Sequence, residues 1–353
     1  IGPEGPLVAG LGDSLRKKNI LTFGPSRIAS MLEASKSFTK TICRKAKIPT
    51  AQSETFQEKS KAKAYIEENN VPIVIKADGL AAGKGVIIAH TKHEALKAVN
   101  DIFNGKFGAA GKSIVIEEFL KGEEASYFVL TDGEAILPLS SAQDHKRAYD
   151  GDTGPNTGGM GAFSPNPIFT PQVEKIVLNN IIKPTLVTMA EQGTPFSGIL
   201  YAGLMIKDGD PKLIEYNVRF GDPECQTIMV RIGAQILDII LDCIEGNLLN
   251  SKINWSDDHA ITIVMATKGY PNRYETGSEI KNIERVSRES DVEVFQAGTA
   301  LKNKKLISNG GRVLNITARA NSLQEAKTKA YKAVALVEWE EGFYRNDIGW
   351  RAL

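Results

Sequence analysis

Short apolar runs alternate with helix-like patterns over the first two thirds of the chain. Apolar and β-branched runs predict strands at 21–25, 71–75, 113–117, 125–130, 135–137, 199–206 and 212–218. Apolar residues three or four apart predict helices at 10–20, through Met31 and Phe38, at 61–68 behind Ser60 as N-cap, at 173–192 with a kink at Pro184, and at 234–244 as a buried helix. Between Gln143 and Pro167 this periodicity disappears, in a stretch too long for an ordinary connection and therefore expected to be functional.

From about Asn250 onward the pattern indicates a separate α+β unit. Strands are expected over 260–267 and 312–318, followed by a helix from Leu323. Ser322 and Glu325 have the spacing of a capping box at the start of that helix.

Composition narrows the class of protein. With 353 residues the chain is long enough for two or three domains, and its 42% hydrophobic content is ordinary for a globular protein. No apolar run is long enough for a membrane span. A net charge of +1 gives no excess of positive charge of the kind that binds nucleic acid. The three cysteines stand in no metal or redox spacing, so we expect free thiols and a cytoplasmic protein.

A glycine-rich loop follows the predicted strand that ends at Lys76. The loop runs to Gly85, includes Gly83, and consists mainly of small residues, so its backbone amides can approach phosphate oxygens closely. Two lysines, Lys76 and Lys84, stand near its two ends. The spacing is not that of a P-loop, because Gly85 stands where Ser or Thr would hold magnesium. The alternative is a tight turn with two solvated lysines.

Two further segments combine strand ends with polar groups. The run Glu117, Glu118, Phe119 and Leu120, followed by Glu124, suits an adenine edge and ribose hydroxyls, although by itself a charged strand exit explains this run better. Glu215, Asn217 and Arg219 share one face of a predicted strand. Their oxygens suit magnesium and the arginine suits a transferring phosphoryl group; the alternative is a solvent-facing strand edge.

Candidate substrate contacts lie in two loops. The stretch from Gln143 to Gly161, which includes Lys146, has the charge and exposed amides of a closing substrate loop. Asp222 can receive an ammonium group or cap the helix expected from Glu224.

The order of these features resembles that in the ATP-grasp ligases, and the sequence between them is similar to that of the phosphoribosylamine–glycine ligase family. The matching stretches are 2–7, 32–36, 75–85, 143–147, 152–161, 219–224 and 347–352. The resemblance implies an α/β and α+β multidomain protein: a remnant of an N-terminal Rossmann-like α/β domain at 1–35, an ATP-grasp domain at 36–247 with a mobile small lobe at about 60–127, and a C-terminal α+β domain at 248–353.

The same resemblance implies an activity and assigns roles. A glycine carboxylate would be phosphorylated by ATP and attacked by the amine of 5-phosphoribosylamine, as a step of purine synthesis. The implied nucleotide ligands are Lys36, Lys76, Gly83, Lys84, Gly85, Glu117, Glu118, Phe119, Leu120 and Glu124. Glu215 and Asn217 would hold Mg²⁺ or Mn²⁺, and Arg219, Asp222 and Lys146 are the candidate catalytic residues. We expect a monomer.

Three alternatives remain open at this point. The chain opens at Ile1 without the strand and glycine-rich loop, about 70 residues, with which the family begins. An inactive nucleotide-binding fragment is therefore one alternative. Another ATP-grasp carboxylate–amine ligase is the second, and a piece of a larger fusion is the third.

Overall fold

A computed structural model describes residues 3–81 and 85–353 of the chain. The chain divides into two compact units: unit 1 contains Ile1–Leu139, Ile168–Phe220 and Ile239–Ser251, and unit 2 contains Ser140–Pro167, Gly221–Asp238 and Lys252–Leu353. The predicted division at 35 and 247 stays a prediction. Among the described residues no helix combines the length and apolar character needed to cross a membrane.

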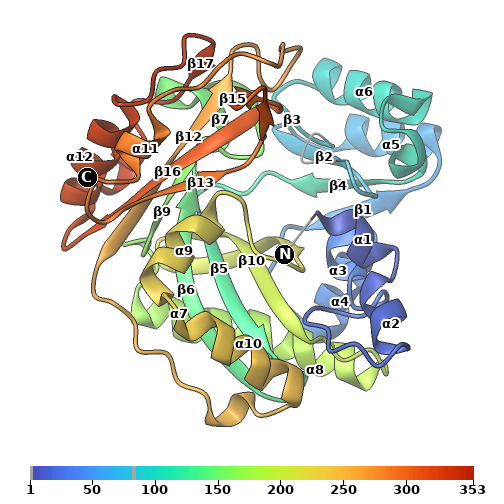
Figure 1. The fold of residues 1–353 in the computed structure, drawn as a ribbon. Coiled ribbons are helices and arrows are strands. Elements are labelled where there is room, and N and C mark those ends of the chain that lie inside the picture. The colour runs from blue at the N-terminus through green and yellow to red at the C-terminus, as the bar shows by residue number, and fades with distance from the viewer. Residues whose placement is uncertain (1–2, 82–84) are drawn as a thin grey trace. The chain divides into compact units, whose positions relative to one another are not determined.

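A small antiparallel sheet lies in unit 1, with strand order β1-β4-β2-β3. Its strands are β1 (Ser53–Phe56), β2 (Ile73–Ala77), β3 (Val86–Ala89) and β4 (Ile114–Glu118). Helices α5 (Lys59–Glu68) and α6 (Lys92–Asp101) lie side by side on one face (Figure 1), and α6 continues into η1 (Ile102–Lys106) and η2 (Gly108–Lys112). Alternate strand residues such as Ile75 and Ile116 are buried against Ile66 and Val99, because successive side chains point to opposite faces of the sheet.

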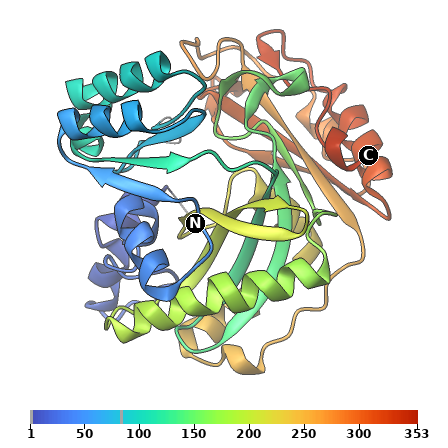
Figure 2. The same ribbon diagram turned by 180° about the vertical axis from the view of Figure 1, so that it is seen from behind.

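The larger strands of unit 1 follow the order β11-β10-β5-β6. They are β5 (Glu123–Thr131), β6 (Ile136–Asp144, which ends in unit 2), β10 (Gly198–Lys207) and β11 (Asp210–Asn217). On one face the cross-strand pair Leu200 and Val129 belongs to the main core of this unit. That face packs against α4 (Lys36–Ala46) and a rod of α7 (Pro171–Val177), η4 (Leu178–Ile182) and α8 (Lys183–Glu191), which Figure 2 shows as nearly continuous.

Short helices complete unit 1. They are α1 (Glu4–Val8), α2 (Leu11–Arg16), α3 (Met31–Ala34), the part of α10 (Gln235–Glu245) from Ile239 onward, and η5 (Leu248–Asn250). Ser35 separates α3 from α4 in an extended conformation, and its hydroxyl accepts a hydrogen bond from the backbone amide of Phe38. This cap begins α4 one residue before the lysines that the site uses.

Unit 2 is built on antiparallel strands in the order β9-β12-β16-β13. These are β9 (Gly161–Ser164), β12 (His259–Thr267), β13 (Val292–Gln296) and β16 (Arg312–Ala320), with β17 (Gly342–Phe343) paired to β12. Ile263 and Ile316 pack with the core beneath α12 (Leu323–Val334), whereas α9 (Glu224–Ile232) packs against the same strands. Because Thr262 and Thr317 alternate with these core residues and bond to each other, they lie on the opposite face.

Two hairpins and three short helices complete unit 2. The hairpins are β7 (Arg147–Tyr149) with β8 (Thr153–Asn156), joined by η3 (Asp150–Asp152), and β14 (Thr299–Lys302) with β15 (Lys305–Ser308). The others are α11 (Ile283–Val286) and η6 (Trp350–Ala352). The stretch 143–167, in which the sequence shows no periodicity, thus contains the β7–β8 hairpin and β9, and its functional role stays a prediction.

Several local predictions need correction. Residues 21–25 form no strand, because Gly24 has a φ of +127° and the backbone carbonyls there accept from the Arg16 side chain. The single helix expected through Met31 and Phe38 is broken at Ser35. Helix α5 begins at Lys59 behind Glu58, so Ser60 is not its N-cap.

The prediction that the helix at 234–244 is buried is wrong. In α10, Leu237 is 62% exposed and Leu241 is 41% exposed, while Ile239 and Cys243 are buried. The strands expected at 199–206, 212–218 and 260–267 are confirmed to within two residues, and Ser322 caps α12 as predicted, accepting from the Glu325 amide.

Candidate active site

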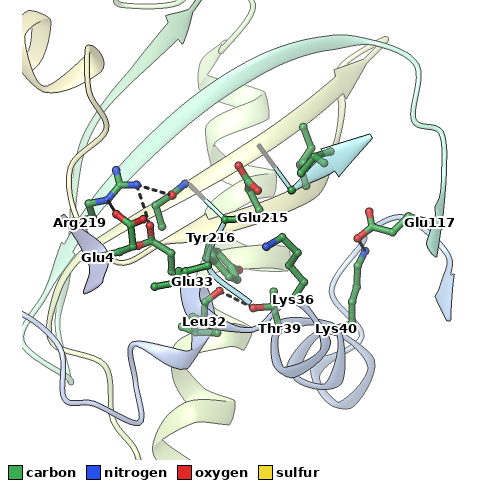
Figure 3. Close-up of a pocket in the computed structure, with 16 residues that line it drawn as sticks. Glu4, Leu32, Glu33, Lys36, Thr39, Lys40, Glu117, Glu215, Tyr216 and Arg219 are labelled. Carbon is green, nitrogen blue, oxygen red and sulfur yellow. Dashed lines mark hydrogen bonds and ion pairs between the residues drawn. The ribbon is translucent and has the colours of Figure 1, made fainter. Parts of the chain in front are cut away.

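A cavity of about 130 Å³ lies in unit 1 between α3, α4, the loop after β2 and the end of β11. Figure 3 shows Arg219 together with Glu4 and Glu33, and Lys40 together with Glu117, among the side chains that line it. Charged and amide groups dominate the lining: Glu4, Glu33, Lys36, Lys40, Glu117, Glu215, Asn217 and Arg219. The sequence brings them from four separate stretches of chain, so the site exists only in the folded unit.

Strand β11 supplies one wall of the cavity. Tyr216 and Val218 are buried in the core of unit 1, and the residues that alternate with them, Glu215, Asn217 and Arg219, line the cavity. The prediction that these three polar groups share a face is confirmed, and the alternative of a solvent-facing edge is excluded. A period of two along the strand is the cause.

Glu215 presents a carboxylate to the cavity. Figure 3 draws no hydrogen bond or ion pair from it to the other lining residues shown. The side-chain oxygen of Asn217 accepts from the Arg219 guanidinium at 3.3 Å. A carboxylate and an amide oxygen two residues apart are hard donors of the kind that Mg²⁺ prefers.

Arg219 is held by two acidic residues that sequence reasoning missed. Its Nη2 donates to Glu33 Oε1 at 2.9 Å, and its Nε lies 3.8 Å from Glu4 Oε2. Glu33 Oε2 also accepts from the Val218 backbone amide at 2.8 Å. Burial raises the pKa of Glu33, although the nearby Arg219 opposes that shift. Glu33 therefore fixes both the backbone at the end of β11 and the direction of the guanidinium.

Lys36 opens helix α4 beneath the loop after β2. Its Nζ donates to the Gly79 carbonyl at 3.2 Å, and its backbone amide donates to the Asp78 carbonyl at 3.2 Å. Burial lowers the pKa of Lys36, and the negative charge of Glu215 opposes the shift. An anion placed beside Lys36 would find a cation already desolvated for it.

Asp78 anchors the glycine-rich loop to helix α4. Its carboxylate accepts from the Ser37 amide at 2.8 Å, from the Ser37 hydroxyl at 2.7 Å and from the Ser35 hydroxyl at 3.1 Å. The interpretation of this stretch as an ordinary turn therefore misses its connection to α4. Two acceptor oxygens at a helix start are matched to the free amides and the positive dipole there.

Glycines in this loop are required by close packing. A Cβ on Gly79 would lie 2.8 Å from the Cα of Ala110, and one on Gly85 would lie 2.7 Å from the Cβ of Ala81. Gly85 lines the cavity. The predicted ligands Gly83 and Lys84 lie outside the described residues.

Two lysines and one glutamate form a buried cluster, of which Lys40 and Glu117 line the cavity. Lys76 Nζ lies 3.0 Å from Glu117 Oε2, and Lys40 Nζ lies 3.4 Å from Glu117 Oε1. All three side chains are only about 4% exposed. Lys76 and Glu117 were predicted as site residues, whereas Lys40 was not, because one lysine among the four of helix α4 and its cap region carries no distinguishing signal.

The predicted adenine segment lies beside this cluster along the chain. Glu118 is exposed, and its carboxylate accepts from the Gln52 amide at 3.0 Å. Phe119 and Leu120 are half-buried, with the Phe119 ring 6.4 Å from that of His90. Glu124 lies on β5 opposite Met205. The cavity lining includes Glu117 but not these described residues, and their nucleotide roles stay predictions.

Two of the predicted catalytic residues belong to unit 2. Asp222 accepts from Arg312 Nη2 at 2.8 Å and from Gln226 Nε2 at 3.0 Å. It makes no capping bond to α9, so that alternative for Asp222 is wrong. Lys146 lies just before β7, where its backbone carbonyl accepts from the Thr157 amide at 2.7 Å. The part that Asp222 and Lys146 play in a reaction stays a prediction.

Arg312 was missed by sequence reasoning and joins the two candidate substrate segments of unit 2. Its Nη1 donates to the Gly158 and Asp222 carbonyls, both at 2.7 Å. Asp222 and Gly158 are far apart in sequence, and nothing in the pattern around a β-strand arginine indicates that it links them. A polar residue at a strand start is too common a feature to single out.

A second arginine cluster holds the β7–β8 hairpin of unit 2. Arg345 is completely buried and makes a two-point contact with Asp347, at 2.7 and 2.8 Å, and a third bond to Asp152 at 2.8 Å. Asp347 also accepts from the Gly151 amide, and Arg351 binds Asp152. We call Arg345, Arg351, Asp152 and Asp347 the Arg345 cluster.

Comparison with known proteins agrees with this geometry. The model of the phosphoribosylglycinamide synthetase ATP-grasp (A) domain matches residues 34–225, and that of the C domain matches residues 260–351. A phosphoribosylamine–glycine ligase of Brucella melitensis is 54% identical over 353 residues, covering 100% of this chain and 83% of the relative. The crystal structure of phosphoribosylamine–glycine ligase from Thermotoga maritima has a TM-score of 0.86 at 35% identity, covering 93% of this chain and 81% of that one.

A more distant structure shares the fold alone. The biotin carboxylase domain of 2-oxoglutarate carboxylase from Hydrogenobacter thermophilus, solved in complex with MgADP, has a TM-score of 0.74 at 17% identity, covering 96% of this chain and 74% of that one. The fold and the lysine-lined cavity thus define an ATP-grasp protein, in the class of ATP-dependent carbon–nitrogen ligases. Within that class, the chain belongs to the phosphoribosylglycinamide synthetase family.

Proposed function

We propose that this protein joins glycine to 5-phosphoribosylamine at the expense of ATP, giving N1-(5-phosphoribosyl)glycinamide, ADP and phosphate. The single observation that carries the proposal is the cavity in which Lys36, Glu215 and Arg219 meet beside the Lys76–Glu117 pair. Desolvated lysines suit phosphate oxygens, and the Glu215 carboxylate, which bonds to none of the other lining residues drawn in Figure 3, suits a divalent ion bound to those oxygens.

The proposed reaction has two steps, phosphorylation of glycine and attack by the amine. A carboxylate oxygen of glycine attacks the γ-phosphorus of ATP, the bond to the bridging oxygen breaks, and ADP leaves with a glycyl phosphate formed. The amine nitrogen of phosphoribosylamine then attacks the acyl carbon, inorganic phosphate leaves, and the nitrogen loses a proton. Phosphorylation is needed because a free carboxylate is a poor electrophile.

The residues of the cavity bind and orient rather than react. Lys36 and Lys76 hold phosphate oxygens, and Arg219, fixed by Glu33, faces the side where charge develops. Because these groups are held by hydrogen bonds before substrate arrives, they need little reorganisation in the transition state. Water has little room in a cavity of about 130 Å³ once a phosphate chain is present.

Glu215 and Asn217 would hold Mg²⁺ or Mn²⁺. The donor set fits, because one carboxylate and one amide oxygen leave most positions of an octahedral ion for water and phosphate. Among the described residues there is no group of three or more acidic, cysteine or histidine side chains placed to bind a metal alone. A metal bound here would supply charge neutralisation on the phosphate oxygens.

The finer assignments rest on the family resemblance. Glycine and phosphoribosylamine are the proposed substrates, with Asp222 and Lys146 as their candidate contacts, and a monomer in the cytoplasm is expected. Free thiols at Cys43, Cys225 and Cys243 are compatible with that compartment.

The test is ADP release by the purified chain with freshly made phosphoribosylamine. The proposal requires release that depends on both glycine and the amine, and a product of the mass of phosphoribosylglycinamide. Release that depends on a different amino acid would replace it by another ligase of this fold. Binding of ATP without release under any of these conditions would replace it by a nucleotide-binding module.

A further inference from the structure

Asp78, the first residue after β2, bonds to three consecutive residues at the start of α4. Its carboxylate accepts from the Ser35 hydroxyl at 3.1 Å, and from the amide and the hydroxyl of Ser37 at 2.8 and 2.7 Å. Its backbone carbonyl accepts from the Lys36 amide at 3.2 Å. One loop residue therefore fixes Lys36 together with both of its neighbours in the chain.

The loop holds Lys36 at both ends of its side chain. The backbone amide of Lys36 donates to the Asp78 carbonyl, and its Nζ donates to the Gly79 carbonyl at 3.2 Å. Lys36 lines the cavity, as Figure 3 shows, whereas Ser35, Ser37 and Asp78 are not among the described lining residues. Of the described residues to which Asp78 bonds, Lys36 alone reaches the cavity.

Asp78 is itself held in place by the segment that precedes β4. Its amide donates to the Ser113 carbonyl at 3.0 Å, and the Gly79 amide donates to the Ala110 carbonyl at 3.2 Å. A side chain on Gly79 would have no room here, because its Cβ would lie 2.8 Å from the Cα of Ala110. The small sheet therefore supports Asp78, and Asp78 in turn supports the start of α4.

The first four amides of α4 are all bonded within the chain. Asp78 accepts from the first two, and Ser35 accepts from the next two through its hydroxyl and its carbonyl. Free amides at a helix start ordinarily attract phosphate groups. The Asp78 carboxylate occupies the place that a phosphate would take at this helix, and Lys36 offers a ligand its ammonium group instead.

Fixing Lys36 before a ligand arrives favours binding, because a lysine side chain is flexible. Ordering a free lysine costs conformational entropy, and that cost weakens the binding of any ligand that has to impose the order. The bonds from Asp78 and Gly79 impose it in the folded chain.

We propose that Asp78 is a positioning residue for the nucleotide phosphates: by fixing the start of α4, it holds the Lys36 ammonium at the cavity before the nucleotide binds. The inference rests on the proposed function and adds a residue to it. Its effect is on the affinity for the phosphate chain and not on the affinity for adenosine, because an ammonium group pairs with phosphate oxygens.

The experiment compares Asp78→Ala with the wild type. Alanine removes the three bonds of the carboxylate and keeps the backbone bonds to Lys36 and Ser113. We expect Mg²⁺ and β,γ-methylene-ATP to bind the variant about tenfold more weakly by titration calorimetry. Adenosine, measured by competition, should bind equally to both. Asp210→Ala is the control, because Asp210 is an exposed aspartate of the same unit.

A double-mutant cycle tests whether Asp78 acts through Lys36. Lys36→Met alone should weaken binding of the analogue more than Asp78→Ala does. In the Lys36→Met background, Asp78→Ala should then cost less than about threefold, because no ammonium is left to position. Additive losses would contradict the inference. An equal loss for the analogue and for adenosine would also overturn it, because Asp78 would then support the pocket as a whole.

If Asp78→Ala does not fold, Ser37→Ala takes its place. It removes one hydrogen bond to Asp78 and puts a good helix former into α4. A loss of about threefold is expected for the analogue alone. An unchanged affinity for the analogue, in whichever of the two variants is measured, contradicts the inference. A wild-type chain that fails to bind the analogue would instead overturn the proposed function, so the two failures are told apart.

Discussion

The two buried charge clusters of this protein are built on opposite principles. In unit 2 the Arg345 cluster sets two arginines against two aspartates, and the completely buried Arg345 directs bonds to Asp152, Asp347 and a backbone carbonyl. In unit 1 the ammonium groups of Lys40 and Lys76 share the single carboxylate of Glu117. A balanced and fully bonded cluster fastens a hairpin, whereas the lysine pair shares its carboxylate beside a cavity that further carboxylates line.

The directions of the pKa shifts follow the same division. Burial would raise the pKa of Asp347, but hydrogen bonds from Arg345 and the Gly151 amide outweigh it and hold that pKa below its ordinary value. In unit 1, burial dominates and lowers the pKa of Lys36 and Lys40. Hydrogen bonds thus outweigh desolvation at Asp347, whereas desolvation outweighs the nearby negative charges at Lys36 and Lys40.

The largest expected effect is on the balanced cluster. Arg345→Met should lower the free energy of unfolding by about 4 kcal/mol, because it leaves two carboxylates without their shared partner. Denaturant unfolding measures it. Arg351→Met, at the exposed rim, should cost no more than about 1 kcal/mol. Equal losses in the two variants would show that the cluster is not centred on Arg345.

His145 gives the next effect, as a dependence on pH. Burial, with Arg345 adding to it, lowers the pKa of His145 from 6.5 to about 4, and its Nε2 accepts from the Gly349 amide. As the pH falls from 6.5 to 4, His145 binds a proton in the unfolded chain but stays neutral in the folded chain. The folded state is therefore destabilised as the pH falls through this window. The loss amounts to about 3 kcal/mol.

His145→Gln should remove most of that pH dependence. Unfolding free energies of the wild type and the variant, measured at pH 7 and at pH 4.5, check this. His93→Gln is the control, because His93 is exposed on α6. A variant that loses as much stability as the wild type on acidification would contradict the assignment to His145.

Glu215→Gln should affect the reaction and leave stability almost unchanged. We expect kcat/KM to fall about a hundredfold, because the amide keeps the shape but loses the charge that a divalent ion needs. Steady-state kinetics with saturating glycine measures it. Asp210→Asn on the same strand is exposed and serves as the control. A normal rate in Glu215→Gln would remove Glu215 from the site.

The smallest effect is expected at Glu33. Glu33→Gln keeps an acceptor for the Val218 amide but weakens the hold on Arg219, and kcat/KM should fall about tenfold. The loss should appear in kcat with little change in the affinity for the ATP analogue. A loss confined to nucleotide affinity would mean that Arg219 contacts bound ATP and not the developing charge.

Much of the site could be predicted from strand periodicity and motif order. Glu215, Asn217 and Arg219 share a face because a period of two is a local property of β11. Lys36 and Lys76 were recognised from their order along the chain. The strands around them were recognised because apolar runs of that length bury in a sheet whatever else surrounds them.

The partners of these residues could not be predicted. Glu33, Lys40 and Asp78 act across sequence separations of 41 to 186 residues, and a single charged side chain on a helix or in a loop has no local pattern that reveals its partner. The hairpin at 147–156 was missed for a similar reason: its strands are short and polar, and Arg345, nearly 200 residues later, holds it in place. Tertiary contacts decide such segments.

The most direct test of the central claim is the binding of Mn²⁺ in the presence of β,γ-methylene-ATP, followed by electron paramagnetic resonance. Glu215 and the lysines of the cavity are proposed to hold one nucleotide and its ion. The account predicts that Mn²⁺ binds the wild type and Asp210→Asn only when the nucleotide is present, and binds Glu215→Gln much more weakly. Equal binding of Mn²⁺ to Glu215→Gln and the wild type would contradict it.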